Sequence, residues 1–99
     1  MSLTHSPAAS VVVERIQTGV RMEKRMLKVL KALADSLDIT LGDLLEGIVL
    51  HALEGKAAFS KPTLAKAAEL RKVFDLTLTA EDAHHLKEKP GARAARSIR

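Results

Sequence analysis

The sequence contains no cysteine, tryptophan or tyrosine, and phenylalanine occurs only at Phe59 and Phe74. Without cysteine the chain can have no disulfide framework, thiolate metal site or cysteine nucleophile, which fits a reducing, cytoplasmic environment. With an aromatic content of 2%, a core has to be built from Leu, Val, Ile, Met and Ala. For a chain of 99 residues such a core is thin, because small chains bury a lower fraction of their surface. Oligomerisation would make up this deficit.

The sequence also lacks the patterns on which most catalytic and metal sites are built. Two of the four histidines, His84 and His85, are neighbours. On a helix their side chains point about 100° apart and cannot hold one ion together. No serine lies in a glycine elbow, and there is no glycine-rich phosphate loop or convincing pair of catalytic carboxylates. We therefore expect no enzymatic activity, no metal and no cofactor. The longest apolar run is far shorter than a membrane span, so we expect no membrane partner.

Charge is distributed unevenly along the chain, although the net charge is only +4. Residues 1–37 carry six basic and three acidic side chains, residues 38–55 carry four acidic and no basic ones, and residues 56–99 carry ten basic and five acidic ones. This asymmetry predicts two faces with different partners.

Apolar residues alternate from Arg15 to Met22, which predicts a half-buried β-strand. One face would carry Ile16, Thr18, Val20 and Met22, and the opposite face Arg15, Gln17, Gly19 and Arg21. A lone strand leaves its backbone donors and acceptors unpaired. We therefore predict that it pairs with the strand of a second copy, which makes the protein a homodimer.

Beyond this strand the pattern is that of amphipathic helices. Apolar residues recur every three or four positions over residues 23–37 and again over residues 41–53, where Thr40 is the expected N-cap. A third helix is predicted to begin after Ser60, and a short fourth one to run from Thr79 to about Lys87. The expected fold is mainly α, with one short N-terminal strand pairing across a dimer, two core helices and additional C-terminal helices.

The order strand, helix, helix at these lengths resembles the ribbon-helix-helix family of dimeric repressors, of the Arc and MetJ type. The resemblance covers about residues 14–53, and Thr40 matches the serine or threonine of the turn between the family's helices. In that family two chains pair their strands into an antiparallel ribbon, which lies in the major groove of DNA. The resemblance implies a dimeric, sequence-specific DNA-binding protein that regulates transcription.

The resemblance places Gln17, Gly19 and Arg21 at the base-facing positions of the ribbon. Independently of the family, Arg to guanine and Gln to adenine are geometrically matched bidentate pairs. In the family, backbone N–H groups at the start of the second helix bind a phosphate, so the resemblance implies this role for Leu41 and Gly42. The predicted phosphate contacts are Arg15, Lys24, Arg25, Thr40, Leu41 and Gly42.

A second interpretation stays open. The same fold can serve as a dimerisation or protein-interaction module without DNA binding, for example in an antitoxin-like protein, and the C-terminal helices could then bind a protein partner. In both interpretations the chain divides into a flexible N-terminal arm (1–10), a ribbon-helix-helix domain (11–55), a C-terminal helical extension (56–88) and a basic disordered tail (89–99).

Overall fold

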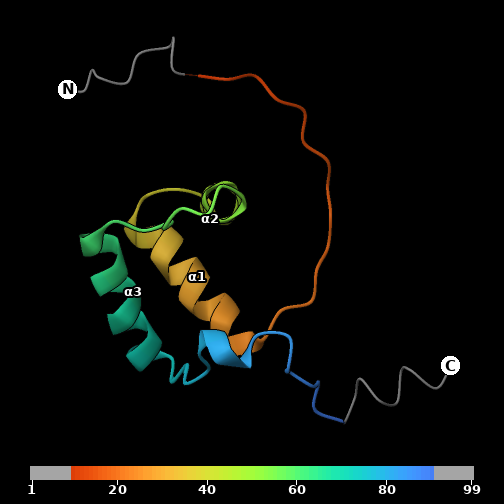
Figure 1. Cartoon of the computed structure of the whole chain (residues 1–99), viewed down its shortest axis with the longest axis vertical. Helices are drawn as coiled ribbons and strands as arrows, with labels where there is room; N and C mark the ends of the chain where they lie inside the picture. The colour runs from red at the N-terminus through yellow and green to blue at the C-terminus, as the bar shows by residue number, and fades with distance from the viewer. Residues whose placement is uncertain (1–9, 91–99) are drawn as a thin grey trace, which may run out of the picture.

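The computed structural model describes residues 10–90. It contains the α-helices α1 (Lys24–Ser36), α2 (Leu41–Leu53) and α3 (Lys61–Val73), followed by one turn of 3-10 helix, η2 (Ala80–Asp82) (Figure 1). The described chain is therefore mainly helical, as predicted.

Helix α1 begins where a glutamate replaces the usual small capping residue. The carboxylate of Glu23 accepts a hydrogen bond from the backbone N–H of Met26 at 2.9 Å, which satisfies one of the donors left unpaired in the first turn. The buried face of the helix consists of Val29, Leu33 and Ala34. The lysines at positions 24, 28 and 31 are exposed. The amphipathic helix predicted over residues 23–37 is confirmed, one residue shorter at each end.

Helices α2 and α3 begin at the caps predicted from the sequence. The Thr40 hydroxyl accepts a hydrogen bond from the backbone N–H of Asp43 at 3.0 Å. The Ser60 hydroxyl accepts one from the backbone N–H of Thr63 at 3.4 Å. Helix α2 ends before Gly55, whose φ of 70° lies in the left-handed region that glycine adopts without strain.

The hydrophobic core is small and centred on α1, which packs against both α2 and α3. Leu33 and Ala34 of α1 meet Leu44 of α2, and Phe59 and Leu70 pack against this cluster. Leu33 is only 1% exposed. By contrast, Val49, Leu50 and Leu53 on the outer side of α2 are 51%, 65% and 78% exposed. A single chain therefore leaves much of the apolar surface of α2 uncovered.

The segment predicted as a strand, Arg15 to Met22, is extended but has no backbone partner within residues 10–90. Residues 10–23 form no regular secondary structure, and no backbone hydrogen bond among the described residues involves positions 10–22. The segment arches away from the helices and returns at the start of α1 (Figure 1). A β-ladder needs a second strand, and this chain contains no other one among its described residues. The ribbon and the dimer accordingly stay predictions.

The predicted fourth helix is wrong in length, because only Ala80–Asp82 is helical. The turn begins as expected: the backbone N–H of Thr79 donates to Oδ2 of Asp82 at 2.8 Å. It ends at once because Ala83 has a ψ of 137° and His84 has a φ of 70°, neither of which continues a helix. Most of the predicted arm (1–10) and basic tail (89–99) lies outside the described residues.

Replacing Thr40 with Ala should lower the free energy of unfolding by about 0.5–2 kcal/mol per chain, since the donor that Thr40 satisfies at the start of α2 loses its partner. Chemical denaturation of the variant measures this cost. Thr77→Ala is the matched control, because Thr77 is exposed and lies outside the helices. Equal midpoints for the two variants would contradict the capping role.

Candidate nucleic-acid interface

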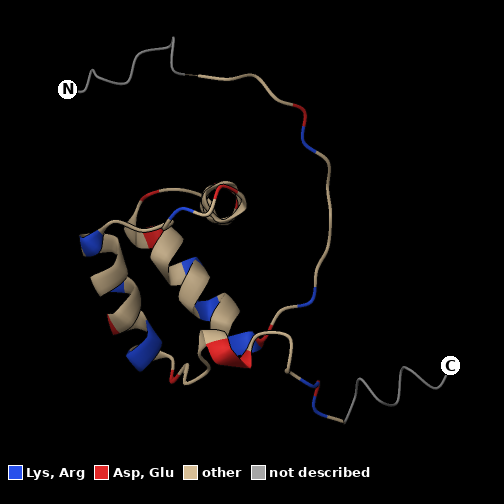
Figure 2. Cartoon of the chain, in the orientation of Figure 1, with Lys and Arg blue, Asp and Glu red and all other residues tan. Residues whose placement is uncertain are grey.

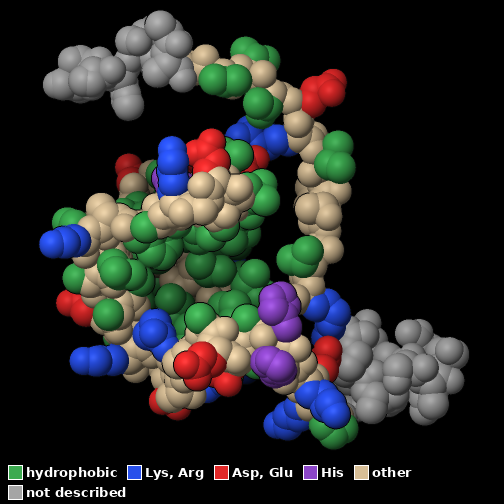
Figure 3. All heavy atoms as spheres, viewed as in Figure 1, with side chains coloured by type: hydrophobic (Ala, Val, Ile, Leu, Met, Phe, Trp, Pro, Cys, Tyr) green, Lys and Arg blue, Asp and Glu red, His purple; other side chains and the backbone are tan. Residues whose placement is uncertain are grey.

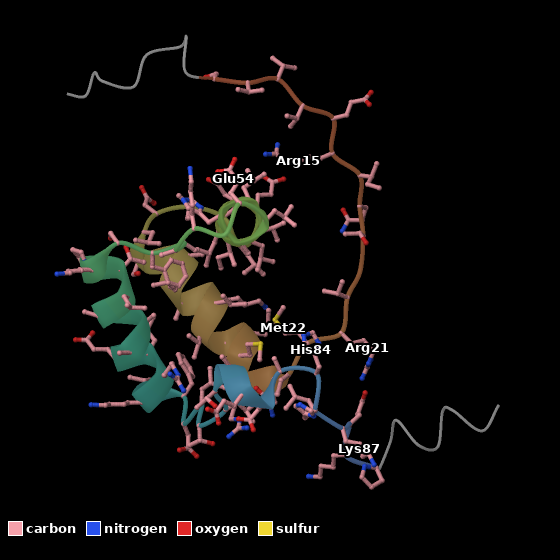
Figure 4. The ribbon with its side chains drawn as sticks, in the orientation of Figure 1. Arg15, Arg21, Met22, Glu54, His84 and Lys87 are labelled. Carbon is pink, nitrogen blue, oxygen red and sulfur yellow. The ribbon has the colours of Figure 1, made fainter. Side chains whose placement is uncertain are left out.

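Two arginines join residues 15–22, the extended segment, to the rest of the chain (Figure 4). Arg15 donates from Nε and Nη2 to the two carboxylate oxygens of Glu46 on α2, both at 2.8 Å. Arg21 donates from Nη2 and Nε to the carboxylate of Glu88, at 2.6 and 3.3 Å. Both pairs are bidentate, the geometry in which guanidinium and carboxylate bind most specifically. The segment is thus joined to the rest of the chain by a side chain near each end, although its backbone has no hydrogen-bond partner among the residues described.

The ion pair at Arg15 stabilises the charged form of both partners. The hydrogen bond from Arg15 holds the pKa of the Glu46 carboxyl below its usual value, and Glu46 in turn raises the pKa of Arg15. Since Arg15 stabilises the ionised form of Glu46, the stabilisation from this ion pair is fully present above the ordinary glutamate pKa. It is lost as the pH falls through the lowered pKa of Glu46.

A groove of about 870 Å³ lies between the extended segment and the start of α2. The predicted contact residues that line it are Arg15, Gln17, Thr40 and Gly42. Leu41, the first residue of α2, supplies a backbone N–H at the same helix end. The groove also contains the carboxylates of Asp43 and Glu46, of which Glu46 is paired with Arg15. The structure therefore brings half of the predicted site together at one end of the segment.

The other half lies at the start of α1. Lys24 and Arg25 occupy the first turn of this helix, which contains no acidic residue. Cations are unfavourable at a helix N-terminus, because the helix dipole already makes that end positive. Arg25 is half-buried and already engaged, since it donates to Glu23 at 2.9 Å and to the backbone carbonyl of Asp75 at 2.9 Å. Lys24 is exposed. At this end of α1 the Glu23 carboxylate caps the helix and pairs with Arg25, so Lys24 is the exposed cation there.

Gly19 lies between these two ends in open space. A Cβ atom built at this position has no other atom within 4 Å, and the backbone of Gly19 is outside the left-handed region. Nothing in the described chain therefore requires glycine there.

Sequence reasoning did not assign the acidic partners Glu46 and Glu88, or the lysines Lys87 and Lys89. Glu46 could only have been suspected from the acidic excess of residues 38–55. The alternation Lys87-Glu88-Lys89 is visible in the sequence, but its position beside Arg21 depends on the chain path after α3.

Within residues 10–90 no group of three or more His, Asp or Glu side chains is placed to hold a metal ion. None of the helices described is both long and apolar enough to cross a membrane.

Comparison with protein families, with curated proteins and with solved structures finds no match to this chain.

The hydrogen bond from the Arg15 guanidinium is the main cause of the lowered pKa of Glu46. Replacing Arg15 with Gln should therefore raise that pKa towards the ordinary glutamate value. Carboxyl-detected NMR titration of Glu46 measures this shift. Arg71→Gln is a suitable control, because Arg71 donates instead to the Leu78 carbonyl and should leave Glu46 unchanged. A Glu46 titration that is the same in the Arg15 variant and the parent would show that the ion pair does not persist in solution.

Proposed function

We propose that the protein is a homodimeric, sequence-specific DNA-binding protein, a transcriptional regulator that acts in the cytoplasm and reads the major groove with a two-stranded ribbon. The observation that carries this proposal is the extended segment before α1. It has no backbone partner among the described residues, bears Gln17 and Arg21, and leads directly into Lys24. Two capped helices follow it, the order expected of a ribbon-helix-helix protein.

The dimer is supported by apolar surface that the single chain leaves uncovered. Ile16 and Val20, on the predicted inner face of the strand, are 87% and 75% exposed. The outer side of α2 is also exposed, at Val49, Leu50 and Leu53. In Figure 3 apolar side chains gather on the face of the helices that is turned towards the extended segment. An exposed apolar strand with open backbone groups is a template for a second strand. An identical copy satisfies both strands at once.

Gly19 suits the centre of such a ribbon. In an antiparallel pair centred on this residue, Gly19 lies opposite its own copy, and the open space around it lets the two backbones approach closely. The same register places Gln17 of one chain opposite Arg21 of the other, on one face. On the opposite face Ile16 lies across from Met22 and can pair with it through apolar contact.

DNA is the partner that best fits the polar face of this ribbon. A two-stranded ribbon fits the major groove, where Arg matches guanine and Gln matches adenine. Lys24, exposed at the positive end of α1, is placed for a flanking phosphate. The backbone N–H groups of Leu41 and Gly42 would meet a second phosphate, and of the two nearby carboxylates Arg15 pairs with that of Glu46.

The alternative, a dimerisation or protein-interaction module without DNA binding, is favoured by one specific observation. The charged residues of the extended segment lie only near its ends, and none lies between Arg15 and Arg21 (Figure 2). The basic surface is therefore not a continuous stripe. The two functions differ in whether the purified dimer binds DNA.

Replacing Arg21 with Ala should weaken binding to the preferred duplex by about 1–3 kcal/mol and relax specificity at one position of each half-site. Mobility shift with a random-sequence pool at two salt concentrations first establishes binding, and selection from the pool supplies the preferred duplex. Lys61→Ala is the control, since α3 begins on the far side of α1 from the extended segment. No shift at low salt, or wild-type affinity in the Arg21 variant, would overturn the repressor function and favour the interaction module.

A further inference from the structure

Four cations gather where the end of the extended segment meets residues 86–89. Arg21 and Lys24 come from one side, and Lys87 and Lys89 come from the other. Together they line a groove of about 560 Å³. These two stretches are far apart in the sequence, so the cluster is a product of the fold.

The two carboxylates in the same groove are engaged by arginines. Glu23 pairs with Arg25 at 2.9 Å, and Glu88 pairs with Arg21 at 2.6 Å. Within residues 10–90 the ion pairs do not include Lys24, Lys87 or Lys89. The groove consequently has a net positive charge at the point where the proposed ribbon ends.

The bond between Arg21 and Glu88 leaves part of the guanidinium available. Glu88 is bound by Nε and by one hydrogen of Nη2. A guanidinium has five N–H donors, so Nη1 and the second hydrogen of Nη2 form a free edge. That edge can bind O6 and N7 of guanine while the other edge stays on Glu88. A side chain fixed in this way loses less conformational entropy when it binds.

We propose that residues 86–89 are a second component of the DNA interface. Glu88 is a positioning residue that orients Arg21 towards guanine, and Lys87 and Lys89 bind the backbone phosphates beside that base. This inference rests on the proposed function, and it gives the segment after η2 a specific role in binding double-stranded DNA. Twofold symmetry repeats the arrangement at the other end of the ribbon.

The lysines are tested with the full chain carrying Lys87→Gln and Lys89→Gln together. Each lost phosphate contact should flatten the slope of log affinity against log salt by about 0.9. The dimer loses two lysines from each chain, so its slope should become shallower by up to about 3–4. Affinity for a random-sequence duplex and for the selected duplex should fall by a similar factor, about tenfold or more at low salt. The matched control replaces Lys66 and Lys72, two exposed lysines of α3, with Gln.

Glu88 is tested with Glu88→Gln, which keeps the shape of the side chain but removes its charge. The ratio of affinities for the selected and the random duplex should fall by roughly fivefold, since a neutral acceptor binds the guanidinium less strongly. In a chain that already carries Arg21→Ala the same change should leave this ratio unaltered, because the positioned group is gone.

The outcomes separate this inference from the proposed function. If the parent protein binds no DNA, the proposed function fails. If the parent binds DNA but the double lysine variant keeps its salt slope, residues 86–89 lie outside the interface and the inference fails. If Glu88→Gln tightens binding to the selected duplex without changing the ratio, Glu88 competes with DNA for Arg21, and the positioning role is wrong.

Discussion

The extended segment before α1 has no backbone partner among residues 10–90, and most of the other features depend on this constraint. Its apolar residues Ile16 and Val20 stay exposed, and within the described part of the chain the ion pairs at Arg15 and Arg21 join it to Glu46 and Glu88. The helical body is small, with a core centred on Leu33. A second copy would supply a partner strand for the segment and would also cover the exposed apolar side of α2.

The proposed function follows from what the segment carries once it is paired. Strand alternation places Gln17 and Arg21 on one face, and the cations of the first turn of α1 follow directly. The positive end of that helix and the groove beside Lys87 and Lys89 extend the charge beyond the ribbon. Base-reading residues would thus lie between phosphate-binding ones, the division of labour common to sequence-specific DNA-binding proteins.

Local signals allowed the helices to be predicted from the sequence, because caps and apolar periodicity act over a few residues. Thr40 and Ser60 cap their helices as expected, α2 has the predicted extent, and α1 is one residue shorter than predicted at each end. The fourth helix was overestimated because the backbone of Ala83 and His84 ends it, which no periodicity reveals. The partners of Arg15 and Arg21 could not be predicted, since Glu46 and Glu88 are distant in sequence and meet them only through the path of the folded chain.

The central claim is that residues 15–22 pair with the same residues of a second chain, and amide hydrogen exchange tests it most directly. In a two-stranded antiparallel ribbon only every second residue of each strand donates to its partner. If the ribbon forms, exchange should be slow at alternate positions between Ile16 and Val20, and this protection should be lost when the protein is diluted. Exchange at the rate of an unfolded chain at every one of these positions, at all protein concentrations, would contradict the claim.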